Sequence, residues 1–161
     1  MASTSRLLSR MRARGRPVVL LMVGPPGSGK STLAQRLMRT GGERGQQWAR
    51  VCQDQLGNRA KCERSLQAAL AQKQNCIIDR CNFDRKQRGS FCEIAKASSA
   101  ACVALVLSLP VHLCEQRARE RTSHEGGVMG AKAGPVVRRI AGMMRPPVAH
   151  GSGLAGCKLS V

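Results

Sequence analysis

The stretch VGPPGSGKST, residues 23–32, joins an apolar run to a glycine-rich segment that carries one lysine. The apolar run Pro17–Val23 predicts a strand buried on both faces, as in a parallel sheet. Lys30–Arg39 follows with Leu33 and Leu37 on one side, which predicts a helix. The segment therefore predicts a buried strand, a glycine loop and a helix in immediate succession.

This loop matches the Walker A pattern G-x-x-x-x-G-K-S/T over residues 24–31. Its glycines allow main-chain N–H groups to point at phosphate oxygens, and the following helix adds its positive end. In this pattern Lys30 reaches the β and γ phosphates and the hydroxyl of Ser31 ligates Mg²⁺. We therefore expect ATP or GTP to bind with Mg²⁺ at Gly24, Pro25, Pro26, Gly27, Ser28, Gly29, Lys30, Ser31 and Thr32.

The rest of the chain alternates predicted strands and helices. The predicted strands are 49–52, 75–79 and 101–109, with a further one at 158–161, and the predicted helices are 58–72, 84–97, 111–121 and 135–144. Residues 122–134, with four glycines and no periodicity, predict a mobile loop. This alternation predicts an α/β fold with a mostly parallel sheet, helices on both faces and a functional crevice at the carboxyl ends of the strands.

Bulk composition favours a single domain with polyanionic partners. The 161 residues include 27 basic and 9 acidic side chains, for a net charge of +18. Such a surplus favours nucleic acid, although a GC-rich genome would give a similar arginine bias. Aromatic residues are only 2% of the chain, which argues against a base-stacking platform.

Cysteine spacing and apolar run lengths indicate an intracellular protein that does not span a membrane. The eight cysteines form no Cys-x-x-Cys pair, so we expect reduced thiols rather than a zinc site. No apolar run approaches the ~20 residues of a membrane span. Residues 1–16 hold five arginines and no acid, which is typical of an organelle transit peptide, a basic nucleic-acid-binding arm or a solvated tail.

The aspartates suggest the chemistry. Asp54 and Asp79 follow the predicted second and third strands, at the edge of the sheet where phosphates should bind. A kinase needs a carboxylate to accept the proton of the attacking hydroxyl and another group to hold the metal. Asp54 is the candidate base, with helix capping as its alternative. Asp79 is the candidate for holding the metal or positioning the acceptor, with a structural role as its alternative. Asp84, three residues before Gln87, fits a helix cap.

Arg117 and Arg121 precede the glycine-rich loop. At a spacing of four they would share a helix face. Arginines on a closing lid can neutralise the charge of a transferring phosphoryl group, which is the role we predict for both. A solvated basic face is the alternative.

Four spaced segments together resemble a known family: the Walker A loop, VCQDQLG, CIIDRCNFDRKQR and LSLPVHLCEQRARERTSHEGG. They resemble the P-loop kinase of polynucleotide 5′-hydroxyl kinases, and more narrowly the kinase-like domain of plant and algal aprataxin-like proteins. The resemblance implies an adenylate-kinase-like P-loop NTPase, a three-layer α/β/α fold with a five-stranded sheet in the order 2-3-1-4-5 and an arginine-bearing lid. It also implies that Asp54 activates the 5′-hydroxyl of a nucleic acid, that Asp79 acts after strand three, and that Arg117 and Arg121 act from the lid.

The resemblance covers about residues 17–147, which we expect to form the kinase domain, between the basic segment 1–16 and a tail at 148–161 that is either a last strand or truncated. The histidine-triad and zinc-finger domains of aprataxin-like proteins, and the phosphatase motif D-x-D-x-T, are absent from this chain. The resemblance implies a nuclear location, whereas the first residues favour a chloroplast or mitochondrion.

The sequence thus predicts an ATP- and Mg²⁺-dependent kinase that phosphorylates the 5′-OH of DNA or RNA in repair or RNA end processing. Two alternatives remain: a small-molecule kinase on the same fold, and a nucleotide- or nucleic-acid-binding module without turnover.

Overall fold

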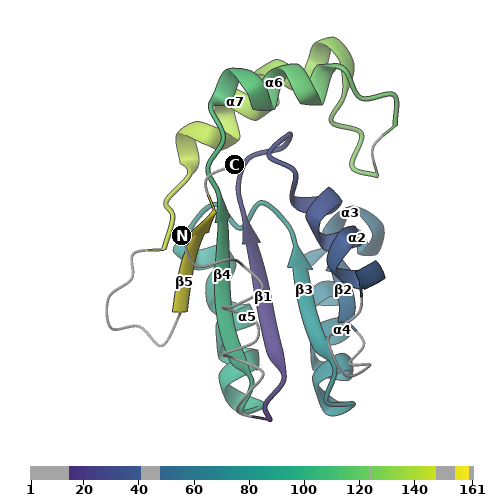
Figure 1. Ribbon diagram of the computed structural model, residues 1–161, viewed down its shortest axis with the longest axis vertical. Helices are drawn as coiled ribbons and strands as arrows, with labels where there is room; N and C mark the ends of the chain where they lie inside the picture. The colour runs from purple at the N-terminus through teal and green to yellow at the C-terminus, as the bar shows by residue number, and fades with distance from the viewer. Residues whose placement is uncertain (1–14, 41–47, 124, 148–154, 160–161) are drawn as a thin grey trace.

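A five-stranded parallel sheet forms the centre of the molecule (Figure 1). The computed structural model describes residues 15–40, 48–123, 125–147 and 155–159. The strands are β1 (Val18–Val23), β2 (Trp48–Cys52), β3 (Asn75–Asp79), β4 (Ala101–Leu107) and β5 (Ala155–Leu159). Their order, β2-β3-β1-β4-β5, confirms the predicted arrangement 2-3-1-4-5.

Helices cover both faces of the sheet and its carboxyl end. They are α2 (Lys30–Thr40), α3 (Gln53–Leu56), α4 (Arg59–Ala71), α5 (Arg85–Ala97), α6 (Val111–Arg119) and α7 (Ala133–Met143), with a 3-10 turn η1 (Gly130–Lys132) before α7. Helices α4 and α5 pack on one face, and α2 packs on the other. This is the predicted three-layer α/β/α arrangement.

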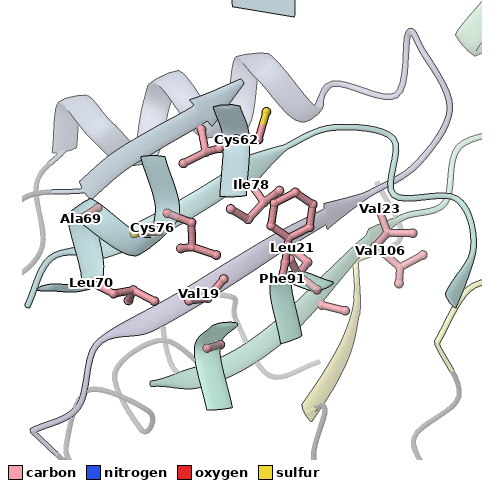
Figure 2. Close-up of a cluster of buried hydrophobic side chains, with 14 residues drawn as sticks. Val19, Leu21, Val23, Cys62, Ala69, Leu70, Cys76, Ile78, Phe91 and Val106 are labelled. Atoms are coloured by element: carbon pink, nitrogen blue, oxygen red, sulfur yellow. The ribbon is translucent and has the colours of Figure 1, made fainter. Parts of the chain in front are cut away.

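Strand β1 is buried on both faces because the two layers share it. Val19, Leu21 and Val23 join the cluster under α4 and α5, whereas the alternate residues of β1 join the cluster under α2. Figure 2 shows the first cluster, which includes the fully buried ring of Phe91 from α5. The continuous apolar run of β1 is therefore the pattern expected of a central parallel strand.

Side-chain caps begin two of the helices. Asn58 accepts a hydrogen bond from Lys61 N at 3.0 Å and starts α4. Asp84 accepts one from Gln87 N at 2.7 Å and starts α5, which confirms the predicted cap. Because Asn58 caps α4 and no side chain caps α3, Asp54 is not the cap of either helix, and that alternative reading is wrong.

The lid consists of α6, η1 and α7, which lie across the carboxyl ends of the strands (Figure 1). It has its own small core of Cys114, Ala118, Ala133 and Val137. These small side chains let the two helices pack closely above the sheet.

Four predicted boundaries are corrected by the structure. Strand β4 ends at Leu107 rather than 109, and α6 ends at Arg119 rather than 121. The predicted loop 122–134 ends in η1, and α7 begins at Ala133 because Pro135 is tolerated inside a first helical turn. Strand β5 pairs with β4 over Ala155–Leu159, so it begins three residues before the predicted 158.

Residues 1–14, the predicted basic segment apart from its end, lie outside the described residues. Within the described residues, no helix combines the length and apolar character needed to span a membrane.

Candidate active site

The glycine-rich loop connects β1 to α2 and lies directly beneath the lid. Gly27 has φ +85°, and a Cβ at this position would overlap the main-chain carbonyl of Cys114 in α6. Only glycine therefore satisfies both the backbone angle and the close approach. The phosphate loop and the lid are thus in direct main-chain contact.

Lys30 is the first residue of α2, and its side chain folds back over the loop. It is only 7% exposed. Its Nζ donates to Pro25 O at 2.7 Å and to Ser28 Oγ at 3.4 Å. The ammonium group is thereby held at the loop, next to the main-chain groups that the sequence pattern assigns to phosphate.

Asp79 lies at the end of β3, beside the start of α2. Its Oδ1 accepts a hydrogen bond from Ser31 Oγ at 3.3 Å. Its Oδ2 accepts two from Arg50 of β2, from Nε at 2.9 Å and from Nη2 at 2.7 Å. A hydroxyl and a carboxylate oxygen side by side are ligands that suit Mg²⁺, so the residues present fit the predicted metal.

Arg50 links this carboxylate to the lid. Besides Asp79, it donates to Glu125, which follows α6, from Nη1 at 3.1 Å and from Nη2 at 2.8 Å. Burial by itself lowers the pKa of Arg50, but the hydrogen bonds to Glu125 and Asp79 outweigh it, and the pKa is raised overall. Arg50 is therefore a permanent cation that ties the lid loop to the carboxylate of Asp79.

Glu125 is the lid's side of this connection. It also accepts from Gln55 Nε2 in α3 at 2.8 Å. The hydrogen bond from Arg50 lowers the pKa of Glu125, so the carboxylate stays ionised. Together with a bond from Cys52 Sγ at 3.4 Å, four bonds from β2 and α3 hold this part of the lid loop in place. The next residue, Gly126, lies beside Asp54, whose Oδ2 would be 2.5 Å from a Cβ built on that glycine.

Asp54 lies in α3, immediately after β2, and faces the phosphate loop. It lines the same cavity, of about 240 Å³, as Lys30, Ser31, Asp79 and Arg121. Within the described residues its carboxylate makes no hydrogen bond or ion pair. The carboxylate is thus free to accept a proton from a group bound in this cavity.

Arg121 lies just past α6 and lines two cavities. The second cavity, of about 510 Å³, is formed by the loop, α2, Leu107, Arg117 and Arg121. Burial lowers the pKa of Arg121, and its Nη1 is buried without a hydrogen-bond partner among the described residues. Arg117 lines only the second cavity. The structure therefore brings both arginines to the second cavity, but only Arg121 also lines the first cavity with Asp54.

The predicted loop residues divide between the two cavities. Pro26, Lys30 and Ser31 line only the first, Ser28 and Thr32 line only the second, and Gly27 and Gly29 line both. Gly24 and Pro25 line neither. They support the loop, through Gly24 N donating to Cys81 O at 3.2 Å and through Pro25 O accepting from Lys30.

Sequence reasoning missed the far wall of the first cavity. Arg80, Cys81, Phe83 and Gln87 follow β3 there, and Val128 and Ile140 come from the lid. The guanidinium of Arg80 lies 5.5 Å from the centroid of the Phe91 ring. Its Nη1 is buried without a hydrogen-bond partner among the described residues, and burial lowers its pKa. The sequence signal that could have identified Arg80 as a site residue was its position, directly after Asp79 at the carboxyl end of a strand.

These features define the class of P-loop NTPases with a kinase-like fold. They are a glycine loop between a buried strand and a helix, a hydroxyl beside a carboxylate at a strand end, and a lid that carries arginines. Residues 19–134 match the AAA_33 family, described as an AAA domain, and the chain belongs to that family.

Two curated proteins are similar to this chain. It is 36% identical over 132 residues to "Transcription factor bHLH140" of Arabidopsis thaliana, an alignment that covers 79% of this chain and 14% of that protein. It is 26% identical over 112 residues to "Putative bifunctional polynucleotide phosphatase/kinase" of Acanthamoeba polyphaga mimivirus, covering 69% of this chain and 25% of that protein. The chain thus spans a quarter or less of the curated relatives it matches.

Solved structures share the fold at low identity. Kti12 of Chaetomium thermophilum, in complex with ADP-AlF3, has a TM-score of 0.66 at 18% identity, covering 87% of this chain and 88% of its own. APS kinase CysC of Mycobacterium tuberculosis, in complex with AMPPNP and APS, has a TM-score of 0.53 at 16% identity, covering 65% and 70%. A gluconokinase of Sinorhizobium meliloti 1021 has a TM-score of 0.53 at 15% identity, covering 88% and 82%. The first two hold nucleotides, as expected for this fold.

Proposed function

We propose that this chain is an ATP-dependent phosphotransferase whose acceptor is the 5′-hydroxyl of DNA or RNA. The observation that carries the proposal is the single cavity lined by Lys30, by the Ser31–Asp79 pair and by Asp54, whose carboxylate has no hydrogen-bond partner among the described residues. A hydroxyl bound there has a proton acceptor on one side and phosphate-binding groups on the other. This is the arrangement that in-line phosphoryl transfer requires.

The donor nucleotide occupies the second cavity and the loop. The phosphates lie along the loop, with Lys30 at the β and γ positions. Ser31 and Asp79 would hold Mg²⁺, which would supply positive charge to neutralise the phosphate oxygens. The second cavity, with Leu33, Leu107 and Arg117 in its wall, takes the rest of the nucleotide.

Asp54 acts on the acceptor. As the hydroxyl oxygen attacks the γ phosphorus, its proton passes to the Asp54 carboxylate. Arg121 lines both cavities, and the charge that develops on the transferring group supplies the partner that its buried Nη1 lacks within the described residues. Arg117 supports the nucleotide from the same side.

Charge in the acceptor wall supports a nucleic acid rather than a neutral sugar or nucleoside. Arg80 lines this cavity, and its Nη1 is buried without a hydrogen-bond partner among the described residues. A buried donor of a charged group is costly to leave unpaired unless a ligand supplies an acceptor, and an anionic acceptor suits it best. The phosphodiester next to a terminal nucleotide supplies such a charge, and the net charge of +18 attracts the rest of the strand.

The similarity to the viral protein named as a polynucleotide phosphatase/kinase supports the same acceptor class. We extend the proposal to a role in DNA repair or RNA end processing, related to the kinase-like domain of aprataxin-like proteins. The corresponding compartment is the nucleus, or a nucleic-acid-containing organelle if residues 1–16 act as a transit segment.

The test is transfer of labelled γ-phosphate to a 5′-OH oligonucleotide, compared with a panel of sugars and nucleosides. The wild type should label the oligonucleotide in the presence of Mg²⁺ and not in excess chelator. Labelling confined to the small molecules would assign a small-molecule kinase instead. ATP binding without any labelled product would assign a binding module without turnover.

Asp54→Asn tests the base. It should lower kcat about 10²–10⁴-fold while leaving ATP affinity nearly unchanged. Asp84→Asn is the matched control, since it makes the same chemical change at a helix cap, where asparagine also caps well. Near-normal turnover of Asp54→Asn would contradict the assignment of the base.

A further inference from the structure

Two thiols outside the candidate active site lie next to each other. Cys92 of α5 and Cys102 of β4 are separated by 3.7 Å between their sulfur atoms, and the Cys102 thiol donates a hydrogen bond to Cys92 Sγ. Both are partly exposed, whereas most of the other cysteines with described side chains are buried, namely Cys52, Cys62, Cys76 and Cys114. Among those residues, this is the one pair whose sulfur atoms are in direct contact.

The connection between α5 and β4 holds the pair together. The helix ends at Ala97, and the chain turns through Ser99, which has φ +53°, into β4. Ala100 N donates to Ala95 O at 2.8 Å and closes this turn. The two sulfur atoms therefore approach through a short, hydrogen-bonded connection rather than through a long flexible loop.

We propose that Cys92 and Cys102 are a redox site that forms a reversible intramolecular disulfide between α5 and β4 when the protein meets a hydroperoxide. A modest rotation of the side chains brings sulfur atoms already in contact to bonding distance. The proposal is independent of the phosphotransferase activity, because neither cysteine lines either cavity.

The chemistry assigns a different role to each thiol. The hydrogen bond from Cys102 lowers the pKa of Cys92, with further help from the charge of Arg88 one turn earlier. The same hydrogen bond raises the pKa of Cys102, as does its burial. Cys92 is therefore the attacking thiolate and Cys102 the resolving thiol.

The two steps balance with one equivalent of hydroperoxide. The Cys92 thiolate attacks one peroxide oxygen and breaks the O–O bond, which gives the sulfenic acid and a hydroxide or alkoxide. Cys102 then attacks the Cys92 sulfur, forms the S–S bond and releases the sulfenic oxygen as water. Both sulfur atoms are oxidised by one electron each, and the peroxide takes up the two electrons.

The disulfide would fix the helix that connects the acceptor wall to the lid. Gln87, in the first turn of α5, lines the first cavity. The buried Arg88 donates to Asn82 O and, at the end of the lid, to Arg145 O, each at 2.8 Å. Oxidation should therefore raise the melting temperature, and reduction by dithiothreitol should reverse the rise.

The experiment uses the full chain with hydrogen peroxide, followed by alkylation, trypsin digestion and mass spectrometry. Because Lys96 lies between the two cysteines, trypsin places them in separate peptides, 89–96 and 97–117. We expect these peptides joined by a bond that dithiothreitol cleaves, with fragment ions assigning it to Cys102 rather than Cys114. The intact protein should lose two hydrogen atoms and two titratable thiols.

Three variants complete the test. Cys92→Ser and Cys102→Ser should each abolish the linked peptides and the reversible rise in melting temperature. Cys114→Ser, which removes a buried thiol of the same tryptic peptide, should keep both. The proposal would be overturned if peroxide treatment of the wild type gave no link between Cys92 and Cys102, or gave only an overoxidised Cys92. This measurement uses the wild type alone, so it does not depend on whether the variants fold.

Discussion

Gly27 is the position where the phosphate loop is most sensitive to a single added methyl group. Its φ of +85° is one that other residues adopt at a cost of about 1–3 kcal/mol. A Cβ there also overlaps the carbonyl oxygen of Cys114, a main-chain atom that no rotamer change can move. Relief requires a shift of α6 or of the loop, which adds about 1–3 kcal/mol for overpacking.

Gly57 provides the matched control. It has φ +86°, almost the angle of Gly27, but nothing lies within 4 Å of a Cβ built on it. Gly57→Ala should therefore show the backbone cost alone. For a chain of this size, the additional about 1–3 kcal/mol lowers the melting temperature of Gly27→Ala by about 2–12 °C relative to Gly57→Ala.

The assay is thermal unfolding of both variants with and without ATP, followed by calorimetric titration of nucleotide. Gly27→Ala should also lose ATP affinity, because the shift moves Arg117 and Arg121 with α6. Gly57→Ala should bind ATP like the wild type. Equal melting temperatures and equal ATP affinities for the two variants would show that the contact between loop and lid does not constrain the site.

Three further changes test other parts of the structure. Lys30→Ala should abolish measurable ATP binding by titration, whereas Lys132→Ala, at an exposed lysine of the lid, should not. Phe91→Ala should reduce the free energy of unfolding by about 3–5 kcal/mol in denaturant titration, because the ring is fully buried and also lies beneath Arg80. The pKa of Glu125 is lowered in the folded protein by Arg50, so its contribution is complete above its ordinary value of 4.5 and is lost as the pH falls through the folded value. Hydrogen exchange in residues 125–129 should therefore accelerate on acidification in the wild type more than in Glu125→Gln.

Each of these expectations has a contrary result. Lys30→Ala with wild-type ATP affinity would remove the lysine from the site. Phe91→Ala with a loss below about 1 kcal/mol would mean that the cluster under α5 repacks around the gap. A pH dependence that is the same in Glu125→Gln would assign the acid response to another carboxylate.

The sequence predicted the framework because each part carries a local pattern. The run Pro17–Val23 has the length and composition of a central strand, and Asp84 with Gln87 N has the spacing of a cap. The glycine-rich stretch predicts its own loop, since the positive φ of Gly27 and Gly29 is a property of the residue type. Short-range physical chemistry determines such features, so they are visible without the rest of the chain.

The parts that escaped prediction depend on contacts between distant segments. Arg50 lies 29 residues from Asp79 and 75 from Glu125, and no local pattern connects the three. A charged residue in a short strand, two positions before Cys52, was the one visible hint. The four-residue helix around Asp54 is too short for periodicity, and strand β5 is defined by pairing with β4 rather than by its own composition.

Two hydrogen bonds join the start of the phosphate loop to the segment after β3, which forms the far wall of the first cavity. Gly24 N donates to Cys81 O, and the Asn82 amide donates to Met22 O at 2.8 Å. Neither backbone segment can change conformation without disturbing the other. Evolution or protein design toward a different acceptor would therefore keep this backbone and change the side chains at 80, 83 and 87 or the length of the segment between α6 and α7. Libraries directed at those positions are where new acceptor preferences should first emerge.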